Sequence, residues 1–311
     1  MGVFGEFFFV PKATWTAADV PDLAGRVFVV TGGASGIGRE TVKELLRHNG
    51  RVYIAARNRE RAQAVADELV KEVGRAPEVL VVDLASLASV RDAANEFNAK
   101  EQTLDALINC GGAAGESNAT TAEGYDLLFG TNVLGHYYLT HLLLPALKRN
   151  LEAHGRKGRV TSVSSIAHTS HAHIDYETLV PGDARDRKKA LDRYGQSKFG
   201  NVVFAFELAR REGAHIVSSA LNPGTIHTPM YDANKPGVLA SFLMESVMYE
   251  VDHGAITPLW AATALEAENV NGQYLVPWAR VGQAAKEGYD PEVGKKLWTW
   301  LEECVRKFES Q

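Results

Sequence analysis

The sequence has few cysteines and no long apolar run. Only Cys110 and Cys304 occur among 311 residues, too few and too far apart to form a disulfide framework, which fits a reducing compartment. The apolar stretch at residues 3–10 is short and contains Glu6, so it neither spans a bilayer nor resembles a secretory signal. We therefore expect a cytoplasmic protein without a transmembrane segment.

A strong charge of one sign is also missing. The sequence contains 33 Lys and Arg against 38 Asp and Glu, a formal net charge of −5. Without a basic cluster of the kind that displaces counterions from phosphates, we expect no nucleic-acid partner. With 45% hydrophobic and 23% charged residues, the composition excludes disordered and collagen-like chains and allows a large core.

What the sequence does contain is a regular alternation of apolar strand-like runs and helical patterns. Ile37, Thr41 and Leu45 recur at helical spacing before a stop signal at residues 49–50. Repeated strand and helix units predict parallel strands with helices on both faces. The sequence therefore predicts a single-domain α/β fold with a doubly wound parallel sheet of Rossmann type. Its seven expected strands are residues 26–31, 51–56, 79–83, 105–109, 159–164, 215–222 and 273–277.

Two irregular stretches stand out within this pattern. Residues 166–193 and 225–250 each follow an expected strand at its carboxyl end, where open α/β sheets bind their ligands. We expect a catalytic domain at residues 25–285, between an N-terminal extension at residues 1–24 and a C-terminal helix at residues 286–311.

A glycine-rich loop joins the first expected strand to the first expected helix. The stretch VVTGGASGIGRE, residues 29–40, places Gly32, Gly36 and Gly38 there. Bare glycines permit a tight turn and let the backbone approach a pyrophosphate, whose charge is favoured at a helix N-terminus. The loop lacks the Gly-Lys-Ser/Thr ending of a P-loop, so its place in the chain favours a dinucleotide over a nucleoside triphosphate.

The end of the second expected strand bears on which dinucleotide binds. An acidic residue there holds the ribose 2′-hydroxyl of NAD, whereas a cation accommodates the 2′-phosphate of NADP. Arg57 follows Ala56, and no carboxylate occurs before Glu60. We therefore expect NADP(H) to be preferred over NAD(H), with Arg57 at the phosphate. Arg39 is the nearest rival cation, and a solvated start of a helix is the alternative interpretation of Arg57.

Tyr194 and Lys198 lie four positions apart in the stretch RYGQSKFGN, residues 193–201. Residues at this spacing share one face of a helix, so a phenol and an ammonium can converge on one point in a cleft. A free tyrosine is about three pKa units too weak an acid for neutral pH. An ammonium about 4 Å away contributes on the order of 4 kcal/mol at an effective dielectric of ~20, enough to lower the pKa of the tyrosine. A surface pair is the alternative if the spacing is taken alone.

Six motifs in order resemble those of a known family. They are the glycine loop, VVDLAS (81–86), TNVLGHYYLT (131–140), VSSIAH (163–168), YGQSK (194–198) and NPGTIHT (222–228). Together they resemble the short-chain dehydrogenase/reductase family over nearly the whole chain. Arg57, the long gap from Ser165 to Tyr194, and NGQYLVPW at 271–278 look most like its retinol dehydrogenase-like branch.

This resemblance implies an oxidoreductase that interconverts a carbonyl and its alcohol by hydride transfer. Tyr194 would donate the proton, Lys198 would stabilise the phenolate and hold the nicotinamide ribose, and Asn132 would fix a relaying water. Ser165, preferred to Ser164, would hydrogen-bond the carbonyl oxygen. The implied cofactor-binding residues are Gly32, Ser35, Gly36, Ile37, Gly38, Arg57, Asn58, Asp83, Leu84, Asn109, Gly111, Tyr194, Lys198, Pro223, Gly224, Ile226 and Thr228.

The resemblance also implies a substrate lid at about residues 225–250. Its apolar content favours a small lipophilic carbonyl or alcohol as substrate. The helices that begin near Asn132 and Tyr194 resemble the pair that commonly forms a two-fold family interface, so we expect a homodimer or higher oligomer.

Three features fit the resemblance less directly. Residues 109–112 read Asn-Cys-Gly-Gly where the family usually has Asn-Asn-Ala-Gly, which affects the packing around the adenosine half. The histidines at 168–173 lie at a spacing that a metal could use, but a tyrosine acid needs no Lewis acid, so we expect no metal. A dinucleotide-binding regulatory or redox-sensing protein is the alternative function, although such a protein would be free to lose Tyr194 or Lys198.

Overall fold

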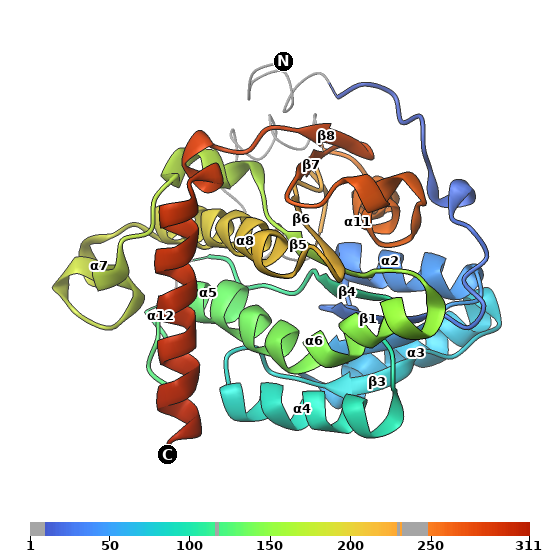
Figure 1. The fold of residues 1–311 in the computed structure, drawn as a ribbon, viewed down its shortest axis with the longest axis horizontal. Helices are drawn as coiled ribbons and strands as arrows, with labels where there is room; N and C mark the ends of the chain where they lie inside the picture. Colours follow the sequence, from blue (N-terminus) through green and yellow to red (C-terminus); the bar gives the residue numbers. More distant parts are fainter. Residues whose placement is uncertain (1–9, 116–117, 229–230, 232–247) are drawn as a thin grey trace.

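A sheet of eight strands, counted over the described residues, lies at the centre of the molecule (Figure 1). The computed structural model describes residues 10–115, 118–228, 231 and 248–311. The strand order is β3-β2-β1-β4-β5-β6-β7-β8, with every neighbouring pair from β3 to β7 parallel. The seven expected strands are confirmed as β1 (Val27–Thr31), β2 (Arg51–Ala56), β3 (Glu78–Val81), β4 (Ala106–Asn109), β5 (Gly158–Val163), β6 (Ile216–Leu221) and β7 (Tyr274–Val276). The order reverses between β1 and β4, the switch point at which such sheets bind ligands.

The eighth strand differs from the sequence-based expectation. β8 (Arg280–Gly282) pairs antiparallel with β7, with Leu275 opposite Val281. The chain reverses between them through Ala279, whose φ of 52° lies in a region that residues other than glycine rarely adopt. Pro277 begins this turn, but a single proline does not predict a further strand after it. β8 covers a strand edge that would otherwise expose unpaired backbone groups.

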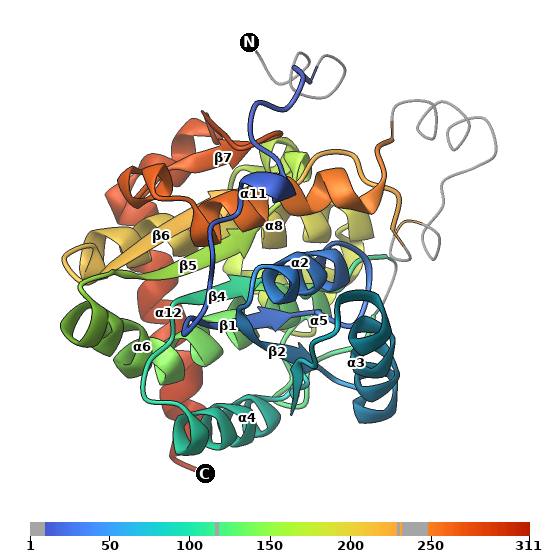
Figure 2. The same cartoon turned by 90° about the vertical axis from the view of Figure 1, so that its right-hand side faces the viewer.

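Helices cover both faces of the sheet because successive strand side chains point to opposite sides. Val27 and Val29 of β1 belong to one core cluster, and Phe28 and Val30 belong to another. Figure 2 shows α2, α3 and α11 in front of one face, while α4, α6 and α8 pack on the other. These helices are α2 (Gly36–Arg47), α3 (Arg59–Val73), α4 (Leu87–Lys100), α6 (Gly135–His154), α8 (Ala190–Glu212) and α11 (Val251–Thr263).

A further helix lies over the second layer. α12 (Pro291–Glu309) begins at a proline and is capped by Asp290, both favourable at a helix start. The ring of Trp298 lies 5.2 Å from the ring of Tyr137 in α6 and 6.2 Å from that of Phe204 in α8. α12 therefore packs against α6 and α8, the two helices from which a dimer was expected. The oligomeric state stays a prediction.

Short elements complete the described chain. They are η1 (Ala17–Asp19), α5 (Leu127–Phe129), η2 (Gly130–Leu134), η3 (Ile166–His171), η4 (Tyr176–Leu179), α7 (Asp183–Arg187), η5 (Glu266–Asn269) and η6 (Lys286–Tyr289). Most of the expected lid, at 229–230 and 232–247, and the first nine residues of the N-terminal extension lie outside the described residues. The domain bounds stay a prediction.

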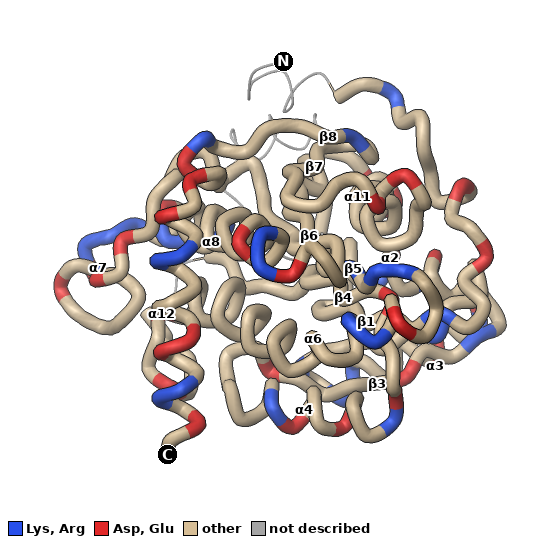
Figure 3. Tube along the Cα trace, viewed as in Figure 1, with Lys and Arg blue, Asp and Glu red and all other residues tan. Residues whose placement is uncertain are grey.

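Charges of both signs are interspersed over the outer helices, and few lie along the central strands (Figure 3). Within the described part of the chain, no helix has the length and apolar character needed to cross a membrane.

Candidate active site

The end of β5 is tied to helix α8 by three hydrogen bonds. The hydroxyl of Ser164 donates to the carbonyl of Lys198 at 2.7 Å. Nζ of Lys198 and Nδ2 of Asn201 both donate to the carbonyl of Val163, at 2.9 and 3.1 Å. These contacts hold the beginning of α8, which carries Tyr194 and Lys198, against the carboxyl edge of the sheet.

Ser165 and Tyr194 meet beside these contacts. Burial raises the pKa of Tyr194, and the nearby Ser165 side chain opposes this shift. The Ser165 hydroxyl also accepts the N–H of Ala167 at 3.2 Å. Nδ1 of His168 lies 2.7 Å from the Ser165 carbonyl, and its Nε2 accepts the N–H of Ala285 at 3.1 Å. Both ring nitrogens of His168 thus have partners. The Ser165 side chain lies beside Tyr194, whereas Ser164 is buried and donates to the Lys198 carbonyl.

Lys198 corrects one expectation about the tyrosine. Its Nζ lies 5.7 Å from the centre of the Tyr194 ring and donates to the Val163 carbonyl. Burial lowers the pKa of Lys198 to about 8. The sequence predicted that this ammonium would lower the pKa of Tyr194. In this structure burial of the phenol raises the pKa of Tyr194, and the opposing effect comes from Ser165 and not from Lys198.

Asn132 lies in η2, a π-helical turn directly before α6. Its Oδ1 accepts the N–H of Ala113 at 2.7 Å, and its Nδ2 donates to the Ala113 carbonyl at 3.0 Å. Nδ2 also donates to the hydroxyl of Ser197 at 2.9 Å, and Ser197 lies between Tyr194 and Lys198. Asn132 therefore connects the loop after β4 to helix α8. The water contact predicted for it stays a prediction.

The glycine loop after β1 and the loop after β4 lie in direct contact. A Cβ on Gly32, whose φ is +67°, would lie 2.8 Å from Cα of Gly111. A Cβ on Gly38 would lie 2.4 Å from the Gly32 carbonyl oxygen, and one on Gly112 would lie 2.9 Å from Oδ1 of Asn132. Of the two glycines in the unusual Asn-Cys-Gly-Gly run, Gly111 lies against the glycine loop, and Gly112 lies against the side chain of Asn132.

Helix α2 begins without a side-chain cap. Ser35 occupies its N-cap position but makes no capping hydrogen bond to the described residues, whereas Asn58 caps α3 and Ser86 caps α4. A helix start with free N–H groups attracts an anion. With Gly32 and Gly33 in the loop before it and Gly36 and Gly38 in its first turn, this helix start fits the pyrophosphate of a dinucleotide.

The two candidate cations for a 2′-phosphate differ in their partners. Arg57 follows β2 directly and is exposed, and the described residues form no ion pair with it. Arg39 is already paired with Glu68, at 3.2 Å, and with Glu72 of α3. Arg57 is therefore the cation that an incoming phosphate can bind without displacing a carboxylate.

Three residues predicted for the adenosine half have different surroundings. Oδ1 of Asp83 accepts the N–H of Ala85 at 3.0 Å, and Leu84 packs against Gly111. The side chain of Asn109 is buried, and its Nδ2 donates to the hydroxyl of Thr140 at 3.3 Å. The amide of Asn109 thus supports α6 from inside the protein, and the predicted place of Asn109 along the adenosine ribose stays a prediction.

The loop after β6 is held at both ends of its described part. Gly224, with φ of +90°, lies so close to Trp278 that a Cβ would be 2.9 Å from the indole ring. Ile226, predicted to meet the nicotinamide, forms a parallel bridge with Tyr249. Pro223 and Thr228 flank this segment at the carboxyl edge of the sheet.

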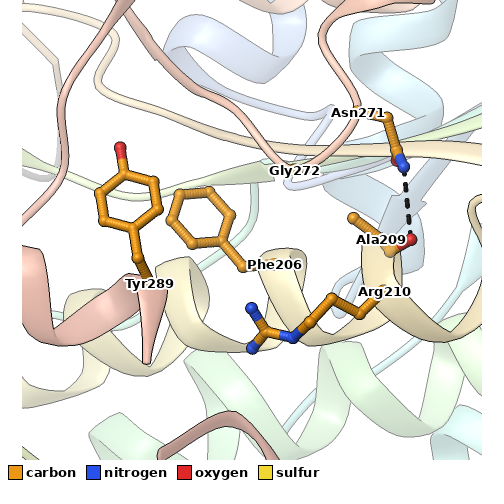
Figure 4. Close-up of a pocket in the computed structure, with 6 residues that line it drawn as sticks. All are labelled: Phe206, Ala209, Arg210, Asn271, Gly272 and Tyr289. Carbon is orange, nitrogen blue, oxygen red and sulfur yellow. Dashed lines mark hydrogen bonds between the residues drawn. The ribbon is translucent and has the colours of Figure 1, made fainter. Parts of the chain in front are cut away.

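A crevice of about 180 Å³ lies apart from all these residues (Figure 4). The rings of Phe206 and Tyr289 stack 4.8 Å apart beside it, and Nδ2 of Asn271 donates to the Ala209 carbonyl at 3.3 Å. Ala209 is eleven residues beyond Lys198 on α8, or roughly 16 Å along the helix. No residue predicted for the site lines this crevice.

Comparison with known proteins agrees with this geometry. The family described as short chain dehydrogenase matches residues 26–174. A short-chain dehydrogenase/reductase of Armillaria gallica is 46% identical over 296 residues, which cover 94% of each chain. This chain belongs to the short-chain dehydrogenase/reductase family. It is accordingly an oxidoreductase of a family that uses a nicotinamide dinucleotide.

Other short-chain dehydrogenase/reductases extend the comparison. One from Phomopsis amygdali is 35% identical over 317 residues, covering 94% of this chain and 93% of the relative. Among solved structures, an uncharacterised protein from Mycobacterium paratuberculosis superposes with a TM-score of 0.73 at 30% identity, covering 94% of this chain and 98% of that one. A short chain dehydrogenase of Shigella flexneri, complexed with NADP, has a TM-score of 0.64 at 23% identity, with coverages of 82% and 98%.

Sequence reasoning missed the residues that hold the catalytic candidates in place. Ser197, Asn201 and His168 make the contacts described above. His168 and Ser197 lie within the motifs VSSIAH and YGQSK, but the motifs did not indicate what these two side chains contact. For Asn201, proximity in sequence to Lys198 is the signal that could have found it.

Proposed function

We propose that this enzyme interconverts a small lipophilic carbonyl and its alcohol with NADP(H), using Tyr194 as acid and base. The observation that carries the proposal is the grouping of Ser165, Tyr194 and Lys198 at the carboxyl edge of the sheet. The uncapped start of α2 and the bare glycine loops next to this group support a dinucleotide there.

The chain supplies each role that carbonyl reduction needs. A bound nicotinamide dinucleotide supplies the hydride. The Tyr194 hydroxyl donates a proton to the developing alkoxide, and it takes the proton back in the oxidative direction. The Ser165 hydroxyl donates a hydrogen bond to the substrate oxygen, and the Lys198 ammonium holds the nicotinamide ribose. Asn132 keeps the loop after β4 against α8 and fixes a water near Lys198.

The preference for NADP(H) rests on Arg57. Its guanidinium lies at the end of β2, has no ion-pair partner among the described residues, and can form a bidentate contact with a phosphate. The lipophilic substrate rests on the apolar residues of the lid segment, which lies largely outside the described residues. Arg57, the long gap from Ser165 to Tyr194 and NGQYLVPW at 271–278 support membership in the retinol dehydrogenase-like branch. The names of the relatives above do not mention this branch.

Location and assembly complete the proposal. The low cysteine content supports a cytoplasmic location, which fractionation of cells would test. The homodimer or higher oligomer expected from the sequence is part of the same proposal. Light scattering over a range of protein concentrations would test it.

The decisive experiment measures NADPH oxidation against a panel of apolar ketones and aldehydes, with NADPH binding measured in parallel by protein fluorescence. Turnover of at least one apolar carbonyl that disappears in Tyr194→Phe is the expected result. Binding of NADPH without turnover of any carbonyl or alcohol would favour the alternative of a regulatory or redox-sensing protein.

A further inference from the structure

His136 connects the π turn of Asn132 to the end of β1. Its side chain is 1% exposed, and both ring nitrogens have partners. Nδ1 lies 2.9 Å from the main-chain carbonyl of Asn132, and Nε2 lies 2.9 Å from Oγ1 of Thr31. Oγ1 of Thr31 in turn accepts the N–H of Gly111 at 2.9 Å. One imidazole therefore links the start of α6, the end of β1 and the loop after β4.

The hydrogen-bond partners select one tautomer of this imidazole. The Asn132 carbonyl can only accept, so Nδ1 carries the hydrogen and donates it. Nε2 then accepts from the hydroxyl of Thr31, which lies closer to this nitrogen than to its other acceptor, the Ile108 carbonyl at 3.4 Å. Burial lowers the pKa of His136 to about 4, so the ring stays neutral near pH 7 and the two nitrogens keep different roles.

We propose that His136 is a positioning residue for the reaction, with one ring nitrogen acting on turnover and the other on cofactor affinity. Nδ1 holds the turn of Asn132, whose amide contacts Ser197 between the two catalytic candidates. Nε2 holds Thr31, whose hydroxyl orients Gly111 against the glycine loop that fits the pyrophosphate. The inference rests on the proposed function.

Three variants separate the two contacts. His136→Asn keeps an amide near the place of Nδ1, His136→Gln keeps one near the place of Nε2, and His136→Leu keeps neither. His141→Asn is the matched control, because His141 is exposed on the same helix and takes no part in this network. The readouts are kcat with a carbonyl identified in the panel, the NADPH dissociation constant by fluorescence, and the Tm.

We expect His136→Leu to lower kcat and to weaken NADPH binding, each by about tenfold, the size that one buried neutral hydrogen bond supports. His136→Asn should restore most of kcat but not the affinity, and His136→Gln should restore the affinity but not kcat. A merely structural histidine would show no such division, so equal effects of Asn and Gln on both readouts would overturn the proposal. Wild-type values in all three variants would overturn it as well.

The test stays informative if other parts fail. Should His136→Leu not fold, the Asn and Gln variants are compared with each other and with His141→Asn. Should wild type bind NADPH but turn over no substrate, the proposed function has failed, and the affinity readout alone decides the inference. A weaker NADPH affinity in His136→Asn than in His136→Gln then supports it, and equal affinities contradict it.

Discussion

The two ends of the central sheet use their polar groups differently. At the amino end, Asp105 is saturated: Oδ2 accepts the N–H of Val27 at 3.0 Å, while Oδ1 contacts Asn150 at 3.3 Å and Arg156 at 3.1 Å. At the carboxyl end, Ser35 makes no capping bond to the described residues at the start of α2, and Tyr194 lies beside the Ser165 side chain. Asp105 thus stabilises the fold at the amino end, whereas the start of α2 and the Tyr194 hydroxyl can meet ligands at the carboxyl end.

The largest expected effect belongs to the carboxyl end. Replacing Tyr194 by Phe removes the proton donor and keeps the ring, so we expect turnover to fall by about 10² to 10⁴ with the Tm and NADPH affinity nearly unchanged. Steady-state kinetics and thermal unfolding of the same preparation measure this. A variant with a wild-type kcat would exclude Tyr194 as the acid.

The amino end should respond in the opposite way. Asp105→Ala leaves the N–H of Val27 and part of Arg156 without their partner, and we expect the free energy of unfolding to fall by about 3 kcal/mol. Asp105→Asn, which keeps an acceptor, should cost less. Denaturant unfolding measures both, and the kcat of the folded fraction should match wild type. A lower kcat at unchanged stability would break the division between the two ends.

A smaller effect is expected at Arg57. Its contact with a 2′-phosphate is charge-assisted, and its loss in Arg57→Ala should weaken NADPH by about 10- to 150-fold while sparing NADH, which has no phosphate there. Adding Ala56→Asp offers an acceptor to the free hydroxyl of NADH and repels the phosphate. Arg39→Ala should be mild, because Arg39 is paired with Glu68 and Glu72.

The measurement for these variants is kcat/KM with both cofactors at fixed ionic strength, since salt screens exposed charges. Equal losses with NADPH and NADH in Arg57→Ala would show that Arg57 supports the loop structurally. A large loss of kcat/KM with NADPH in Arg39→Ala, together with a small loss in Arg57→Ala, would assign the phosphate contact to Arg39.

The smallest effect concerns the pH dependence set by Lys198. Burial lowers its pKa to about 8, so the ammonium is lost as the pH rises through that value, and kcat/KM for reduction should fall there by up to about tenfold per pH unit. The free energy of unfolding changes with pH in the opposite direction. The unfolded lysine titrates near 10.4, so between about 8 and 10.4 the unfolded chain binds more protons, and stability rises with pH. In Lys198→Arg, whose side chain stays charged, the fall of kcat/KM at high pH should disappear. If the fall persists in this variant, it belongs to another group.

Much of this fold could be predicted because local patterns specify it. The apolar runs of β1 and β2, which are buried on both faces, predict strands of a parallel sheet, and this prediction does not depend on which strands lie beside them. The spacing of Tyr194 and Lys198 on one helix face likewise predicts that they share one edge of the sheet. Ser165 could be singled out from Ser164 only through the family resemblance, and the contacts of both hydroxyls agree with that choice.

What sequence could not predict depends on tertiary partners. β8 follows a short turn whose only turn residue is Pro277, and Asn109 points toward Thr140 only because α6 packs there. The pKa of Tyr194 follows from how deeply the folded chain buries the phenol, which the spacing to Lys198 does not reveal. The cover over α6 and α8 comes from α12, whose apolar stripe could be recognised as helical without showing where it docks.

The position of α12 has a consequence for biosynthesis. This helix is translated after every element against which it packs, so while the ribosome is still adding residues 291–309, the aromatic side chains of Tyr137 and Phe204 have no Trp298 to cover them. A nascent chain that has otherwise folded thus carries an apolar strip of the kind that chaperones bind and that promotes aggregation. The strip closes once residues 291–309 have emerged and folded as α12, and a chain truncated before Trp298 would leave it open.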